Sequence, residues 1–256
     1  MIEDMLLPLV GERFRNDERY REGHLRVINA LPQRRVLGLH VPQMKAAAAD
    51  IVRRGDSADI IRQFERERPE NLTYEETVVW GLLINRQRCT SDERAAMLGR
   101  YVPVMDNWAV CDLFCADAKW MGKTEREALW EMLTPWFGSA REFEVRFALI
   151  ASMSYLLHEE WLDRIFGRID ALGFDRIKSE YTSARGRPAH AQSGTVQGAE
   201  PYYVRMGAAW LLATALAKFP ERTRGYVRRS HLPADVVKLY VRKARESFRT
   251  RTIPAI

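Results

Sequence analysis

Apolar residues recur every three or four positions along most of the chain, and strict alternation of apolar with polar residues is rare. The first pattern is typical of amphipathic helices and the second of half-buried strands. No Asn-Gly or Asp-Gly dipeptide is present to mark a two-residue hairpin turn. The sequence therefore predicts an all-α fold. Helices are expected within residues 41–54, 57–67, 73–87, 90–105, 123–137, 141–157, 159–172, 201–219, 220–232 and 233–248, with a further helix capped by Asn107.

Five of these segments open with residues that favour a helix start. A Ser or Thr before the first turn accepts a backbone N–H, and a Glu three positions on completes a capping box. Proline is tolerated in the first turn because no intrahelical bond needs its missing N–H. The signals are Pro42, Ser57, Thr73 with Glu76, Thr90 or Ser91, and Thr124 before an acidic first turn.

The expected helices are of ordinary length, and many fall in pairs that repeat about every 40 residues. Successive pairs of short amphipathic helices bury their apolar faces against each other when they stack as a solenoid. We therefore expect an α-solenoid of HEAT-like helical repeats, forming a single domain over residues 1–256 with a concave basic groove. Residues 178–200 are rich in Gly, Ser and Ala, and we expect them to form a flexible loop insertion.

The chain has a basic balance, with a net charge of +6 and a sequence pI of about 9.3. Arg residues are concentrated in residues 185–192, 222–231 and 241–251. Such a surface permits binding of a polyanion such as nucleic acid, although a solvated helix face has the same composition. No apolar run approaches the roughly 18 residues that a membrane span needs, and the N-terminus lacks the basic start of a signal peptide. We expect a cytoplasmic monomer without membrane contact.

Metal and nucleophile chemistry find little support in the sequence. The cysteines Cys89, Cys111 and Cys115 and the five scattered His give no spacing that completes a tetrahedral zinc site. No His is placed beside a Cys as its base, and no Gly-rich phosphate loop or Gly-x-Ser-x-Gly turn is present. We therefore expect no metal and no cofactor. Cys111 and Cys115 are interpreted as reduced, buried residues of one helix face.

The stretch NWAVCD combines an aromatic ring and a carboxylate one helical turn apart. Trp108 and Asp112 are four positions apart, so they lie on the same helix face. A buried carboxylate is costly unless it is paired, and a large exposed Trp is unusual, whereas a half-enclosed cleft suits both. The alternative is a Trp at the edge of the core beside an Asp in an ion pair. Farther along the chain, Arg146 and Trp210 each interrupt an apolar helix.

In order and spacing these motifs resemble the AlkD-type DNA alkylation-repair glycosylases, a family of HEAT-like repeat proteins. In LGLHVPQMK, Gly38, Val41 and Pro42 match the family's Gly-x-x-x-Pro entry into an early helix. Trp108 and Asp112 match its central Trp-x-x-x-Asp spacing. The resemblance continues through VRFALI, YYVRMGAAW and the basic C-terminal helices, and so covers most of the chain.

The resemblance implies a monofunctional glycosylase that hydrolyses the N-glycosidic bond of cationic alkylated purines, such as 3-methyladenine and 7-methylguanine, in duplex DNA. In that reaction Asp112 stabilises the sugar oxocarbenium ion and orients the attacking water. Trp108 and Trp210 flank the deoxyribose by cation–π attraction, Arg146 holds the phosphate backbone, and Arg205 is a further basic contact. The resemblance implies no cofactor, and a DNA substrate implies association with the nucleoid.

Two other functions are compatible with the same residues. A non-catalytic α-solenoid that binds a nucleic-acid backbone has steeply salt-dependent binding and releases no base. A protein-interaction scaffold uses Trp108 and Trp210 to anchor a peptide, and has no nucleic-acid affinity at physiological salt. Whether the Arg residues share a face with Trp108 and Asp112 discriminates between these alternatives.

Overall fold

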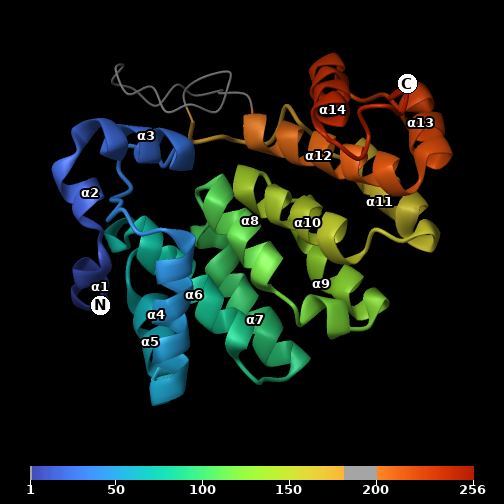
Figure 1. Ribbon diagram of the computed structural model, residues 1–256. Coiled ribbons are helices and arrows are strands. Elements are labelled where there is room, and N and C mark those ends of the chain that lie inside the picture. The colour runs from blue at the N-terminus through green and yellow to red at the C-terminus, as the bar shows by residue number, and fades with distance from the viewer. Residues whose placement is uncertain (1, 182–200) are drawn as a thin grey trace. The chain divides into compact units, whose positions relative to one another are not determined.

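The computed structural model describes residues 2–181 and 201–256, and within them the elements are fourteen α-helices and five short 3-10 helices (Figure 1). The all-α prediction is confirmed. The chain divides into two compact units, the first ending at Trp120 and the second beginning at Met121. The expectation of a single domain over 1–256 stays a prediction, as does the concave groove. Residues 182–200 of the expected loop lie outside the described residues. No helix in the described part of the chain has the length and apolar character that a bilayer crossing requires.

The first unit is built around one helix that is buried almost end to end. Its α-helices are α1 (Glu3–Leu6), α2 (Glu12–Asn16), α3 (Glu18–Ile28), α4 (Val41–Arg54), α5 (Ser57–Arg66), α6 (Tyr74–Arg86), α7 (Ser91–Tyr101) and α8 (Trp108–Asp117). Helix α6 contacts α4 on one side and α8 on another, and α5 and α7 also pack on it. Every α6 residue from Tyr74 to Ile84 is buried. This apolar segment therefore forms the centre of the first unit.

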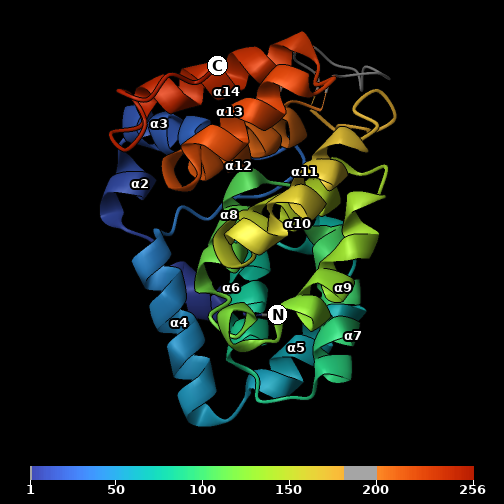
Figure 2. The same cartoon turned by 90° about the vertical axis from the view of Figure 1, so that its right-hand side faces the viewer.

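The second unit repeats this arrangement around α12. Its α-helices are α9 (Arg126–Phe137), α10 (Glu142–Tyr155), α11 (Leu162–Asp170), α12 (Tyr202–Lys218), α13 (Pro220–Arg229) and α14 (Ala234–Glu246). Helix α12 contacts α10, α13 and α14, while α9 packs on α10. Figure 2 shows α13 and α14 beside α12. In each unit, alternate helices along the chain therefore stack side by side, as expected for helical repeats.

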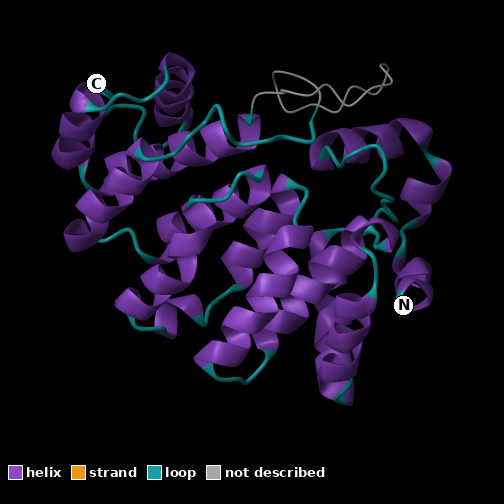
Figure 3. Cartoon of the chain, turned by 180° about the vertical axis from the view of Figure 1, so that it is seen from behind, coloured by secondary structure: helices purple, strands orange, loops and turns teal. Residues whose placement is uncertain are grey.

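The helical repeat is shorter than the sequence predicted. Helices α4, α6, α8 and α10 begin at residues 41, 74, 108 and 142, so each starts 33 or 34 residues after the previous one. The expected period of about 40 was wrong. Helices α4 to α10 have only 10 to 14 residues, and brief turns and loops join them (Figure 3). Short helices with short connections leave no residues to lengthen the repeat.

Local signals placed several helix starts correctly. Thr73 accepts the N–H of Glu76 while the Glu76 carboxylate accepts the N–H of Thr73, which is the predicted capping box of α6. Thr90 and Glu93 form the same arrangement at α7, so Thr90 rather than the following Ser is the cap. Pro42 lies in the first turn of α4. These starts depend on contacts within four residues, which explains why sequence alone locates them.

Other starts differ from the prediction. Asp56 occupies the cap position of α5, and Ser57 is its first helical residue. Helix α9 begins at Arg126, two residues beyond the expected Thr124. Helices α1 to α3 were not predicted at all. Among the α3 residues only Ile28 is buried, so this helix has a weak apolar stripe for sequence reasoning to detect.

Candidate active site

Trp108 and Asp112 lie on a partly exposed strip of a helix that is otherwise mostly buried. The buried residues of α8 are Ala109, Val110, Cys111, Phe114 and Cys115. Trp108 and Asp112 are both half-buried and are one turn apart. A ring and a carboxylate are thus presented together at the edge of the core, where both retain access to solvent.

The amide of Asn107 fixes the start of this helix. Its Oδ1 accepts the N–H of Ala109 at 2.7 Å, which confirms Asn107 as the N-cap. Its Nδ2 donates to the carbonyl of Ile28 at 2.8 Å and to that of Asn29 at 3.2 Å. Asn107 itself is fully buried. One side chain therefore both caps α8 and holds its first turn, including Trp108, against the end of α3.

The residue before this cap is anchored by an ion pair. Arg34 donates from Nε to Oδ2 of Asp106 at 2.8 Å and from Nη1 to the carbonyl of Leu72 at 2.7 Å. Burial raises the pKa of Asp106, and the Arg34 guanidinium opposes that rise by favouring the charged form. The segment that leads into α8 is therefore tied to the start of α6.

A second carboxylate on α8 serves packing between helices. Asp117, in the last turn, lies 2.8 Å from Nη1 of Arg86 on α6 and 3.3 Å from Nζ of Lys45 on α4. It links three neighbouring helices of the first unit. This contact set fixes the far end of α8, while Asn107 fixes the near end.

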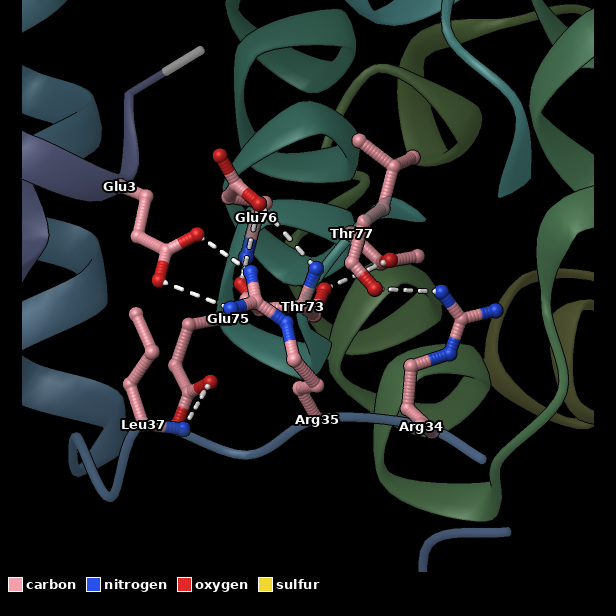
Figure 4. Close-up of polar contacts among 9 residues, drawn as sticks. Glu3, Arg34, Arg35, Leu37, Thr73, Glu75, Glu76 and Thr77 are labelled. Atoms are coloured by element: carbon pink, nitrogen blue, oxygen red, sulfur yellow. Dashed lines mark hydrogen bonds and ion pairs between the residues drawn. The ribbon is translucent and has the colours of Figure 1, made fainter. Parts of the chain in front are cut away.

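A buried carboxylate holds the chain where it enters α4. Glu75, in the first turn of α6, accepts the N–H groups of Leu37 at 2.9 Å, Gly38 at 2.7 Å and Leu39 at 3.1 Å. Figure 4 shows Glu75 with Leu37, beside the pair formed by Arg35 and Glu3. Burial raises the pKa of Glu75, and the three N–H groups oppose that rise.

Trp210 is the most exposed residue on the first four turns of α12. Most residues of this helix are buried, and the positions open to solvent there follow one another every fourth residue: Tyr202, Met206, Trp210 and Thr214. The Trp210 side chain is 38 % exposed. Single exposed apolar side chains are common on protein surfaces, so this exposure makes the ring accessible to a ligand, and its role in binding stays a prediction.

The two candidate arginines of the second unit are buried and engaged by internal acceptors. Arg146, on α10, is 3 % exposed and donates from Nη1 to the carbonyl of Tyr203 at 2.7 Å. Arg205, on α12, is 9 % exposed, forms an ion pair with Asp235 and lies 3.9 Å from Asp175. Their contacts with phosphate therefore stay predictions.

Glu142 joins the start of α12 to the segment that follows α11. Its carboxylate accepts the N–H of Tyr203 at 2.6 Å and the hydroxyl of Ser179. The side chain is 3 % exposed. Burial raises the pKa of Glu142 to about 7, because the N–H groups of Tyr203 and Val204 and the Ser179 hydroxyl only partly compensate the lost hydration. This carboxyl therefore changes charge near neutral pH.

The thiols have no features of a reactive site. Cys111 and Cys115 are free and fully buried on α8. Cys89 is half-buried, and burial raises its pKa, which disfavours the thiolate that nucleophilic chemistry needs. Among residues 2–181 and 201–256, no group of three or more His, Cys, Asp or Glu is placed to hold a metal ion.

Residues 16–178 match the model of a protein family described as DNA alkylation repair enzyme. The chain belongs to this family. The match covers well over half of the sequence and includes every helix from α4 to α11. A comparison with curated proteins found no match, and neither did a comparison with solved structures.

Three of the five candidate site residues lie within the segment that matches the DNA alkylation repair family. Trp108, Asp112 and Arg146 are inside residues 16–178, while Arg205 and Trp210 are beyond them. Trp108 and Asp112 belong to the first unit and share one strip of α8. Arg146, Arg205 and Trp210 belong to the second unit, where α10 and α12 pack together.

Sequence reasoning missed Glu75 and Glu142, two buried carboxylates of this DNA alkylation repair family member. Glu75 and Glu142 both lie in the first turn of a helix that is buried along most of its length. That position is itself a usable signal. An acidic residue at the start of a helix that is mostly apolar is expected to be buried with it and to bind backbone N–H groups of a neighbouring segment.

Proposed function

We propose that the chain is an AlkD-type DNA glycosylase that releases cationic alkylated purines from duplex DNA, with Asp112 as its catalytic carboxylate. The observation that carries the proposal is the strip of α8, where Trp108 and Asp112 are partly exposed one turn apart on a helix that is otherwise mostly buried. The strip lies within the segment matched by the DNA alkylation repair family. Caps at Asn107 and ion pairs at Asp117 hold this helix at both ends.

The chemistry requires little beyond a fixed negative charge and water. An alkylated purine with a positive charge leaves with the electrons of the N-glycosidic bond and becomes neutral, so no acid is needed to protonate it. The sugar is left as an oxocarbenium ion. The Asp112 carboxylate stabilises this cation, orients a water toward C1′ and accepts the proton that the water loses. The Trp108 ring adds cation–π attraction to the same cation.

The remaining residues are proposed as DNA contacts with unequal support. Exposure of Trp210 supports a role in binding the nucleic acid. Arg146 and Arg205 are buried, and each already binds an internal acceptor. We assign these guanidiniums chiefly to holding α12 in place, and their contact with phosphate stays a prediction. The proposed partner is duplex DNA bound by a monomer.

The direct test is release of methylated purines from alkylated duplex DNA, measured by chromatography. Wild type is expected to release 3-methyladenine and 7-methylguanine. Asp112→Asn keeps the size of the side chain and removes its charge, so we expect the single-turnover rate to fall at least about a hundredfold. The matched control is Asp59→Asn, which removes an exposed carboxylate from α5 and is expected to retain the wild-type rate.

Other outcomes assign the protein to the competing functions. Wild type that binds duplex DNA but releases no base indicates a non-catalytic nucleic-acid-binding solenoid. Wild type without DNA affinity at physiological salt indicates a protein-interaction scaffold. Undiminished release by a folded Asp112→Asn variant removes this carboxylate from the mechanism while leaving glycosylase activity in place.

A further inference from the structure

The net positive charge of the chain comes from its C-terminal part. Residues 201–256 contain twelve Lys and Arg against three Asp and Glu, a net charge of +9. The preceding 200 residues contain 28 basic and 31 acidic residues, a net charge of −3. The overall value of +6 therefore conceals a separation of charge along the sequence. The basic part lies entirely beyond the segment matched by the family.

The three acidic residues within residues 201–256 already form ion pairs with cations of the same segment. Each of the three contacts a cation of the same segment: Asp235 with Arg205, Glu221 with Arg224, and Glu246 with Arg242 and Lys243. No other carboxylate side chain exists in residues 201–256 to neutralise the rest. One further cation, Arg222, pairs with Asp163 of α11, so most of the excess is balanced by salt or by an anionic partner.

Helix α14 arranges part of this excess on one face. The residues that it buries, at no more than 1 % exposure, are Val236, Tyr240 and Ala244. At about 100° per residue, the side chains that point away from this buried face are those at positions 238, 242 and 245. These three exposed residues are Lys238, Arg242 and Arg245. Arg249 and Arg251, also exposed, follow in the turn after the helix.

The spacing of these cations suits a row of phosphates. Lys238 and Arg245 are seven residues apart, or about 10 Å along the helix axis. Each strand of duplex DNA presents one phosphate per roughly 3.4 Å of the duplex axis, so a row of about three lies within that length. A face that serves only solubility intersperses both signs of charge, whereas positions 238, 242 and 245 carry a single sign and the carboxylate of Glu246 pairs with Arg242 of the three. Arg also binds phosphate with two parallel N–H groups.

An acidic protein segment is the competing occupant. A shallow hollow of about 530 Å³ on the same face would accept apolar side chains. It is lined by the apolar residues Val237, Val241 and Ile256 and by the charged residues Lys238, Arg242, Arg245 and Glu246. The cations extend past this hollow to Arg249 and Arg251, where the exposed turn offers a partner mainly charge. A polyanion without apolar anchors matches that distribution better than an amphipathic peptide does.

We propose that the outer face of α14, together with Arg249 and Arg251, binds the phosphate backbone of duplex DNA whether or not the DNA is damaged. The inference rests on the proposed function in taking duplex DNA as the substrate, and it adds a contact that is independent of the lesion. Such a contact retains the protein on DNA between lesions and makes its affinity strongly dependent on salt.

The test is the salt dependence of binding to an unmodified duplex, measured by fluorescence anisotropy with the full chain. The variant Lys238→Gln/Arg245→Gln/Arg249→Gln removes three cations of this face. Removing one phosphate contact lowers the magnitude of the slope of log K against log salt by about 0.9, so we expect a decrease of about 2 to 3 for this variant. At low salt the affinity is expected to fall at least about tenfold.

The matched control removes the same net charge elsewhere. Arg53→Gln/Arg62→Gln/Arg100→Gln lies on exposed helix faces of the first unit, where each Arg pairs with a carboxylate. We expect its salt slope to equal that of wild type. Equal slopes for the α14 variant and wild type would overturn the proposal, and so would equal decreases in both variants, since those reflect net charge alone. If the α14 variant binds DNA as wild type does, the competing occupant of this face, an acidic protein segment, is favoured.

Base release is a separate readout that keeps the two proposals distinguishable. A wild-type chain that binds unmodified duplex through this face but releases no purine contradicts the proposed function and supports this inference. A chain that releases purines, and whose α14 variant retains the wild-type salt slope, supports the function and contradicts the inference.

Discussion

At Gly38 the backbone has a φ of +99°, and a Cβ built there lies 2.3 Å from the ring of Phe14. The first value lies in the region that side chains rarely adopt, and the second leaves no room for a methyl group. The N–H of Gly38 also binds the buried carboxylate of Glu75. Three constraints therefore meet at the residue that opens the Gly-x-x-x-Pro motif before α4.

We expect Gly38→Ala to lower the free energy of unfolding by about 2 to 4 kcal/mol, because backbone strain and a steric clash act together. For a chain of this size the melting temperature should fall by at least roughly 5 °C, measured by circular dichroism. Gly99→Ala is the matched control. Gly99 lies within α7 with open space around it, so the added methyl is expected to leave stability equal or slightly higher. Equal melting of the two variants would contradict the assignment.

At the scale of elements, α8 and α12 have the same pattern of burial. Each is mostly buried and opens to solvent mainly along a strip that repeats every fourth residue. A Trp lies on each strip, at position 108 in α8 and at position 210 in α12. Because the rest of each helix is fixed by packing, the backbone that carries each ring is held in position. Rigid elements position binding groups more accurately than loops do.

From this arrangement we expect Trp210→Ala to slow purine release roughly two- to thirtyfold while the protein remains folded. The ring is 38 % exposed, and a cation–π or stacking contact contributes about 0.5 to 2 kcal/mol. Single-turnover kinetics on alkylated duplex measure the effect. Trp210→Phe keeps an aromatic face and should recover most of the rate. If both variants match wild type, this ring has no part in the reaction.

At the scale of the whole molecule, three buried carboxyls influence how stability depends on pH. Burial raises the pKa of Glu75, Asp106 and Glu142. A carboxyl with a raised pKa in the folded state keeps its proton after the unfolded chain has lost it. The folded state then binds more protons, so stability falls as pH rises between the unfolded and folded pKa values. The exposed carboxyls with lowered pKa values change stability only at more acidic pH. The pH dependence above the unfolded pKa therefore comes from the buried carboxyls.

The largest resolved contribution belongs to Glu142, whose pKa rises from 4.5 to about 7. Because of this shift, we expect the free energy of unfolding to fall by up to about 3 kcal/mol as the pH rises from about 5 to about 8. Glu142→Gln should flatten that dependence, since the amide oxygen can accept from Tyr203 and the NH₂ group can donate to Ser179. Urea unfolding across this range measures the change, and Glu131→Gln, an exposed site on α9, is the matched control. An unchanged slope in Glu142→Gln would exclude this carboxyl as the cause.

Much of the fold was predictable because it depends on neighbours in sequence. Thr73, Thr90 and Pro42 fix helix starts through contacts within one turn, and the apolar period identifies ten of the helices. The four-residue spacing of Trp108 and Asp112 was by itself enough to place them on one helix face. The 33- or 34-residue repeat was predicted wrongly, since its length depends on how far each short helix and turn extends.

The tertiary structure alone decided which polar residues are buried. Arg146 and Arg205 have the composition of surface cations, yet long-range packing of α10, α12 and α14 encloses them beside Tyr203 and Asp235. Asn107 is predictable as a cap from its sequence position, but its bond to Ile28 joins residues 79 positions apart. Helix formation depends on residues within one or two turns of each other, and these are neighbours in the sequence. Burial is decided by which distant segments meet, and the local pattern does not contain that information.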